Sequence, residues 1–141
     1  MDASNETTVV SVQRTLRLVF GIVPIVAGLD KFTNLLVHWS NYVAPAFARM
    51  LPVSPHTFML AVGVIEIVAG LGVLFFPRVF GYIVAAWLTC IAINLIAARF
   101  FDIAVRDLVM AVSSLCLARL SVVVPHARHV ARPLEHAPAR G

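Results

Sequence analysis

The sequence predicts an all-α integral membrane protein, a bundle of four helices in the bilayer. Of its 141 residues, 60% are hydrophobic and only 13% are charged, and the mean hydropathy is +0.91. A water-soluble domain could not keep so many apolar side chains off its surface. Each membrane crossing needs roughly 20 mostly apolar residues, so four crossings with their turns use nearly the whole chain. We therefore expect one compact membrane domain and no soluble domain.

The first crossing opens after two arginines and continues to about Leu36. Its apolar run begins at Leu18 and follows a polar segment, residues 1–13, that we expect to form a short tail. The second run extends from Phe58 to Phe76 and has Glu66 as its only charged residue.

The third run, Val79 to Ala98, carries no charge. Only Pro77-Arg78 separates it from the second run, which predicts an antiparallel helical hairpin. The fourth run, Ile103 to Val124, is interrupted by charges near both ends, and its lower apolarity predicts shielding by protein. The predicted division is a polar tail over 1–13, a membrane domain over 14–124 and a basic, disordered tail over 125–141.

The basic residues predict the orientation in the membrane. Four crossings place both termini on one side, and lysine and arginine are enriched on cytoplasmic loops. On the side of the termini lie Arg14, Arg17, Arg78, Arg119, Arg128, Arg132 and Arg140, and on the other lie Lys31, Arg49, Arg99 and Arg106. Both termini are thus predicted to be cytoplasmic. The basic residues behind the net charge of +4 lie at the ends of the apolar runs and do not form a basic face with aromatic residues among them. Nucleic acid is therefore not an expected partner.

The long loop between the first two crossings, Val37 to His56, is predicted on the outer face. It holds Trp39 and Tyr42, whose rings suit the headgroup layer, and a short amphipathic piece, APAFARML. We expect this loop to lie along the interface and to cover the outer end of the bundle.

Helical spacing indicates which way the polar residues of the crossings point. Small residues recur with them at intervals of three and four and therefore form a stripe along one face of each helix. Stripes of small residues mark where membrane helices approach closely. The stripes are Arg17, Gly21, Pro24, Gly28 and Lys31 in the first crossing, Gly63, Glu66 and Gly70 in the second, and Asp107, Ala111, Ser114 and Ala118 in the fourth.

Counting along the antiparallel helices predicts that several polar groups share one interior. Lys31, Asn94, Arg106 and Asp107 each fall about one turn from the outer end of their helix, and Glu66 falls near the midplane. A carboxylate at that depth costs a few kcal/mol unless it is neutral, hydrated or paired, for which Lys31 and Arg106 are candidates.

Two interpretations of this cluster stay open. It is either a structural network of ion pairs that fixes the helix register, or a pocket for a polar-headed ligand or a proton. His38 and His56 flank the outer loop and are candidates to reach a ligand at the pocket mouth.

Other chemistry is poorly supported by the sequence. Cys90 and Cys116 stand singly within apolar runs, so we expect inert buried thiols and no thiolate metal site. His126 and His129 form an HxxH in the basic tail without a further ligand, and no metal site is predicted. No histidine lies inside the core of a crossing, which disfavours a haem held between helices.

Four segments together resemble the DoxX-like family of small bacterial membrane proteins. They are GLDKFTNLLVHWSNYVAP, GVIEIVAGLGVL, GYIVAAWLTCIAINL and FDIAVRDLVMAVSSLCLARL. The resemblance spans about Arg14 to Ser121 and depends on Gly28 with Lys31, on Glu66 among glycines, and on the Arg106-Asp107 pair. It implies a four-helix bundle in the cytoplasmic membrane. It also implies kinship with proteins described as membrane subunits of oxidoreductases, including thiosulfate:quinone oxidoreductase, or as partners of oxidative-stress proteins.

The function expected from these observations is that of an accessory membrane subunit of a respiratory or redox complex, without catalytic residues of its own. A quinone is the candidate ligand, with the pocket formed by Lys31, Glu66, Asn94, Arg106, Asp107, His38 and His56. Other membrane or redox subunits, or further copies of the chain, are the expected protein partners. The alternatives are a small oligomeric transporter or channel with a polar path past Glu66, and a purely structural membrane partner protein.

Overall fold

The structure, a computed structural model, describes residues 3–130, and all regular structure within them is helical. The long helices are α1 (Ala3–Thr33), α3 (Pro55–Phe75), α4 (Pro77–Ala97) and α5 (Phe101–Val130). Between α1 and α3 lie a 3-10 helix, η1 (Trp39–Tyr42), and one helical turn, α2 (Pro45–Ala48). Four helices are long and apolar enough to cross a membrane, which confirms the predicted four-helix membrane bundle.

Proline and serine set the boundaries of α3 and α4. The Ser54 hydroxyl accepts a hydrogen bond from the backbone N–H of Thr57 at 3.2 Å and caps α3, whose first residue is Pro55. Phe76 leaves the helical conformation, with φ of −130°, because Pro77 follows it and starts α4. The connection predicted at Pro77-Arg78 is therefore a single non-helical residue.

The two terminal helices are longer than the sequence predicts. Residues 3–13, expected as part of a polar tail, continue α1 as helix, and α5 passes the expected end at Val124 and reaches Val130. Gln13, the last residue of this extension, is buried: its Nε2 donates a hydrogen bond to Ser121 Oγ at 3.1 Å, so α1 packs on α5 ahead of Arg14. Residues 131–141 of the expected tail lie outside the described residues.

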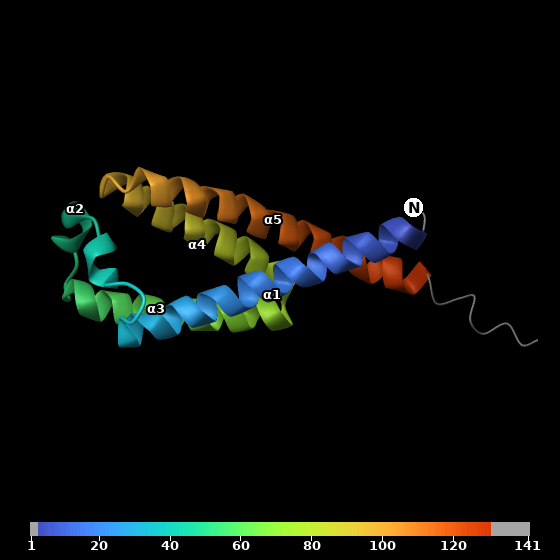
Figure 1. The fold of residues 1–141 in the computed structure, drawn as a ribbon, viewed down its shortest axis with the longest axis horizontal. Coiled ribbons are helices and arrows are strands. Elements are labelled where there is room, and N and C mark those ends of the chain that lie inside the picture. The colour runs from blue at the N-terminus through green and yellow to red at the C-terminus, as the bar shows by residue number, and fades with distance from the viewer. Residues whose placement is uncertain (1–2, 131–141) are drawn as a thin grey trace, which may run out of the picture.

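The helices form two antiparallel pairs, α1 with α3 and α4 with α5 (Figure 1). Toward the end that carries the termini, which we call the terminal end, the two pairs converge, and the start of α1 and the last turns of α5 extend past the α3–α4 connection (Figure 1). The loop end holds η1, α2 and the α4–α5 turn, and there the pairs spread apart (Figure 1). The predicted α3–α4 hairpin exists, but its two arms belong to different pairs.

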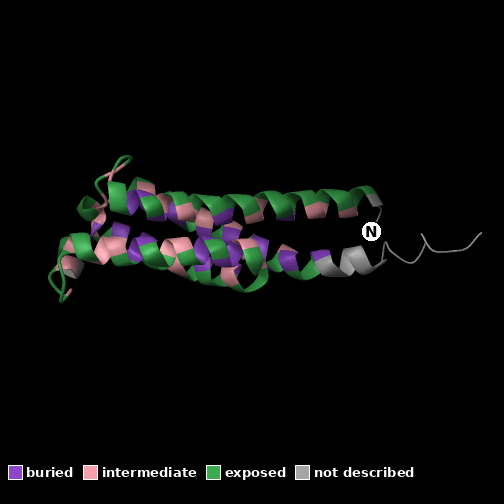
Figure 2. Cartoon of the chain, turned by 90° about the horizontal axis from the view of Figure 1, so that it is seen from below, coloured by how far each residue is buried: buried purple, intermediate pink, exposed green. Residues whose placement is uncertain are grey.

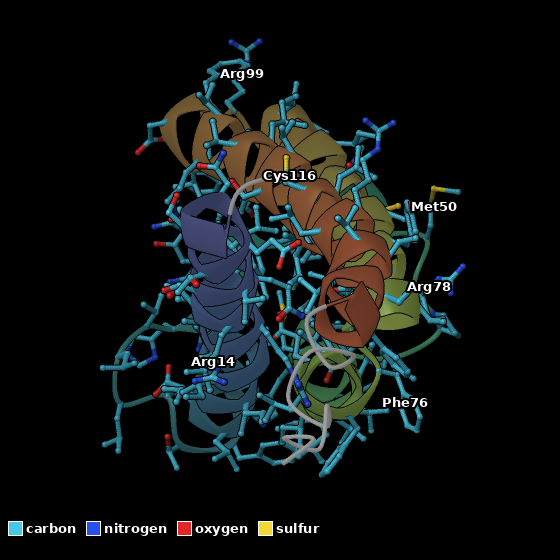
Figure 3. All side chains as sticks on the ribbon, turned by 90° about the vertical axis from the view of Figure 1, so that its right-hand side faces the viewer. Arg14, Met50, Phe76, Arg78, Arg99 and Cys116 are labelled. Carbon is cyan, nitrogen blue, oxygen red and sulfur yellow. The ribbon has the colours of Figure 1, made fainter. Side chains whose placement is uncertain are left out.

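One apolar core cluster lies toward the terminal end, where all four long helices contribute, and a second, with Ala92, Leu95 and Ala104, lies toward the loop end. Phe20, Val73, Val84 and Leu117 pack together in the first cluster, one from each long helix. The buried residues lie on faces turned toward other helices, and exposed apolar residues cover the outside (Figure 2). Cys90 and Cys116 belong to the exposed set, which corrects the expectation that both thiols are buried. Figure 3 shows Cys116 on the outward side of α5.

Glycines bring α1 and α3 into backbone contact. A Cβ atom added to Gly28 would lie 2.5 Å from the carbonyl oxygen of Gly63, and one added to Gly70 would lie 2.5 Å from that of Gly21. The two contacts belong to one antiparallel register, because Gly21 and Gly28 are seven residues apart on α1 and Gly63 and Gly70 are seven residues apart on α3. The predicted small-residue stripes of these two helices therefore face each other.

Candidate functional site

The centre of the candidate site is an ion pair between α1 and α3. Lys31 Nζ lies 2.6 Å from Glu66 Oε2, and the two side chains are only 3% and 13% exposed. The contact between Gly28 and Gly63 holds the two backbones together beside this pair. Of the two cations proposed for Glu66, the structure selects Lys31.

Trp39 of η1 covers the ion pair from the loop end. Its ring centroid lies 3.7 Å from Lys31 Nζ, a distance at which the ring face attracts the ammonium group. Its indole N–H donates a hydrogen bond of 2.7 Å to Asp30 Oδ2. The expected cover over the bundle is thus formed by η1, and the APAFARML piece contributes the four-residue α2 and the buried Ala44.

Asp30 organises this cover, although the sequence analysis did not select it. Besides the indole, its carboxylate accepts hydrogen bonds from the backbone N–H groups of Leu35 and Leu36, both at 3.0 Å. The chain turns beneath them through Asn34, whose φ is +49°. The sequence does contain a signal for this role, because Asp30 is an acidic residue in the last turn of an apolar helix, where a charged side chain needs polar partners.

Asn94 of α4 ties the other half of the loop to the bundle. Its Nδ2 donates to the carbonyl oxygen of Tyr42 at 2.9 Å, and its Oδ1 accepts from the N–H of Ala44 at 3.1 Å. Both ends of the amide are therefore engaged by loop backbone. The structure thus places Asn94 as an anchor of η1 and of the residues that follow it.

Asp107 of α5 faces the ion pair from the second helix pair. It is 6% exposed and close enough to interact electrostatically with both Lys31 and Glu66. Its salt-bridge partner in the described chain is Arg106, at the long distance of 3.8 Å, and that arginine side chain is 68% exposed. Asp107 is thus a buried carboxylate with weak local compensation, whereas Arg106 faces outward.

The two predicted histidines remain apart from this cluster. His38 precedes η1, His56 lies in the first turn of α3, and both are exposed. Within residues 3–130, neither imidazole makes a hydrogen bond or an ion pair. No group of three or more His, Cys, Asp or Glu side chains in the same range is placed to hold a metal ion.

The indole Nε1 of Trp87 is a buried hydrogen-bond donor that has no partner in the described part of the chain. Trp87 lies eleven residues after Phe76 and Glu66 lies ten residues before it, so the two are at similar depth on α4 and α3. An indole N–H left unbonded in an apolar interior costs free energy, and a polar ligand or water at this level would relieve that cost.

The formal charges in this region do not balance. Lys31 neutralises Glu66, and Asp30 is satisfied by loop donors, but Asp107 adds a further buried negative charge. The region can therefore take up a proton, a cation or a hydrogen-bond donor at Asp107. We call Lys31, Glu66 and Asp107 the polar triad.

The model of the DoxX family matches residues 13–101, which is more than half of the chain and includes α3, α4 and both glycine contacts. Neither curated proteins nor solved structures give a significant match.

Proposed function

Because this chain belongs to the DoxX family and is a multi-pass membrane protein, we propose that it is an accessory membrane subunit of a respiratory or redox complex. Its place would be the bacterial cytoplasmic membrane, with both termini in the cytoplasm. The excess of arginine at the terminal end supports this orientation. The expected partners are other membrane or redox subunits.

We further propose that the polar triad binds the headgroup of a quinone. The observation that carries this proposal is the buried, incompletely compensated carboxylate of Asp107 opposite the Lys31–Glu66 pair. A quinone ring has carbonyl oxygens that accept hydrogen bonds, and its reduced form has hydroxyl groups that donate them. The triad offers both functions, because an ammonium group only donates and an ionised carboxylate only accepts.

The surroundings also suit a flat ring with an apolar tail. Trp39, Tyr42 and Phe100 form a row of aromatic rings near the loop end, with centroid separations of 6.4 Å and 5.1 Å. Trp87 Nε1, which has no hydrogen-bond partner within residues 3–130, adds a further donor at the depth of Glu66. A prenyl chain would extend into the lipid that surrounds the exposed apolar faces of the helices.

In this arrangement the residues have separate tasks. Lys31 would donate a hydrogen bond to a carbonyl oxygen while Glu66 keeps the ammonium group in place. Asp107 would accept a hydrogen bond from a hydroxyl group or hold a proton. A bound quinone would supply the redox chemistry, taking up two electrons and two protons on reduction, and Trp39 would limit access of water from the loop end.

Quenching of tryptophan fluorescence tests this function directly. The full chain, purified in a neutral detergent, is titrated without oxygen with a short-chain menaquinone in its reduced, quinol form, whose hydroxyl groups can donate to Asp107. Binding is measured as quenching of the two tryptophans, Trp39 and Trp87. We expect saturable quenching and, for Asp107→Asn, affinity about tenfold weaker, the equivalent of one charged hydrogen bond. The matched control is Asp102→Asn, an exposed acid of the same helix, which should bind like the wild type.

The proposal fails if quenching rises in proportion to quinol without saturation, since that reports only partitioning into the micelle. It also fails if the Asp107→Asn and Asp102→Asn variants bind equally well.

A further inference from the structure

A groove at the terminal end, remote from the polar triad, combines positive charge with apolar walls. Its volume is about 420 Å³, and residues from all four long helices line it. Gln13 of α1 and Ser121 of α5, which are hydrogen-bonded to each other, belong to its lining. The size lies in the range of sites that hold small molecules.

Two arginines give the groove its charge. Arg17 donates hydrogen bonds from Nε, at 2.7 Å, and from Nη2 to the Leu74 carbonyl oxygen, which leaves three of its five N–H bonds outside this contact. Arg78 also lines the groove and is exposed. None of the described residues lining the groove is Asp or Glu. The positive end of the α4 dipole adds to this field, because the N-cap residue Phe76 provides no side-chain cap.

The walls of the groove are apolar and open. Phe75 and Phe76 are 71% and 65% exposed, and Val79 continues the same surface on α4. Seen from the terminal end, Arg78 and Phe76 lie on one side of the bundle and Arg14 on the other (Figure 3). Arginines at this level mark the end of the apolar spans, so the groove lies where lipid phosphates meet acyl chains.

We infer that this groove binds the headgroup of an anionic phospholipid. The guanidinium groups of Arg17 and Arg78 would hold the phosphate. The side-chain amide of Gln13 and the hydroxyl of Ser121 would contact the rest of the polar headgroup. The first part of each acyl chain would pack on Phe75, Phe76 and Val79. A lipid fits better than a free phosphate ion, because an ion would leave these phenyl rings uncovered.

Native mass spectrometry of the delipidated full chain tests this inference, with phosphatidylglycerol and phosphatidylcholine of identical acyl chains as probes. An arginine near the membrane surface improves binding of an anionic lipid about fivefold. We expect one phosphatidylglycerol to bind at least about fivefold more tightly than phosphatidylcholine. Arg78→Gln should remove about fivefold of this affinity, and Val79→Trp, which fills the groove without changing charge, should weaken binding of phosphatidylglycerol.

The matched control is Arg14→Gln, which removes the same charge from the same end of the bundle but lies outside the groove. It should change affinity by less than about twofold. Equal affinity for the two lipids, or an Arg14→Gln effect as large as that of Arg78→Gln, would overturn the inference. Displacement of the lipid by inorganic phosphate at equal concentration would overturn it too, because the apolar walls would then contribute nothing.

Discussion

Replacing Gly28 by alanine tests how closely α1 and α3 must approach. The new Cβ would lie 2.5 Å from the Gly63 carbonyl oxygen and 3.2 Å from the Ile67 backbone nitrogen. These are backbone atoms, so no rotamer change can relieve the contact. Ordinary contact begins at 3.4 Å, so the two helices must separate locally by about 0.9 Å (3.4 − 2.5).

The cost of this separation has three parts. Overpacking of this kind costs about 1–3 kcal/mol. If the same displacement reaches the ion pair, the 2.6 Å contact between Lys31 and Glu66 lengthens to about 3.5 Å (2.6 + 0.9) and loses much of a charged hydrogen bond, worth about 1.5–3 kcal/mol. Alanine returns about 1 kcal/mol through its higher helix propensity. The free energy of unfolding should therefore fall by about 2–4 kcal/mol.

The measurement is reversible unfolding in mixed micelles, followed by circular dichroism as denaturing detergent is added. Gly21→Ala is the matched control, since it has the same propensity gain on the same helix but the three atoms nearest its Cβ belong to the side chain of Leu74, which can move. We expect the control to lose less than about 1 kcal/mol. The reasoning is refuted if Gly28→Ala unfolds like the wild type or if Gly21→Ala is the less stable of the two.

The ion pair, the loop anchor and the orientation each allow a further test. Glu66→Gln leaves a buried cation poorly compensated and should lower the free energy of unfolding by about 3–5 kcal/mol, and adding Lys31→Met should recover part of that loss; no recovery would contradict the pairing. Asn94→Ala removes both loop hydrogen bonds, so the Ala44 amide should exchange with deuterium about tenfold faster, and unchanged exchange would contradict the anchoring role. Alkaline phosphatase, which is active only outside the cytoplasm, should be inactive when fused after Gly141 and active when inserted near Val53. The reverse pattern would overturn the predicted orientation.

Helical periodicity predicts much of the bundle because membrane helices must place small and polar residues inward. The stripe of Asp107, Ala111, Ser114 and Ala118 is buried along its whole length, and Ser114 Oγ donates a hydrogen bond of 2.9 Å to the Gly81 carbonyl oxygen. The approach of Lys31 to Glu66 follows from the same periodicity combined with antiparallel packing. These features depend on local spacing, which the sequence contains.

The remaining features depend on tertiary contacts that spacing does not encode. Residues 3–13 look polar in isolation, but they are helical, and Gln13 is buried through a hydrogen bond to a partner 108 positions away. Asp30 gains its role from a turn at Asn34 that places Trp39 above the ion pair. Asn94 was predicted to bind a ligand because of its depth, yet its amide is directed to loop backbone that the sequence could not position.

These contacts separate two kinds of polar residue at the loop end, and quinone binding can distinguish them. Asp30 and Asn94 hold the loop, so loosening it through Asn94→Ala should speed both entry and exit of a ligand and leave its affinity within about twofold of the wild type. Asp107 contributes charge inside the bundle, so Asp107→Asn should weaken the affinity while leaving exchange at Ala44 unchanged. Stopped-flow quenching gives both rates. If Asn94→Ala weakens equilibrium binding as much as Asp107→Asn does, the loop itself forms part of the site, and the assignment of the ligand to the polar triad alone is wrong.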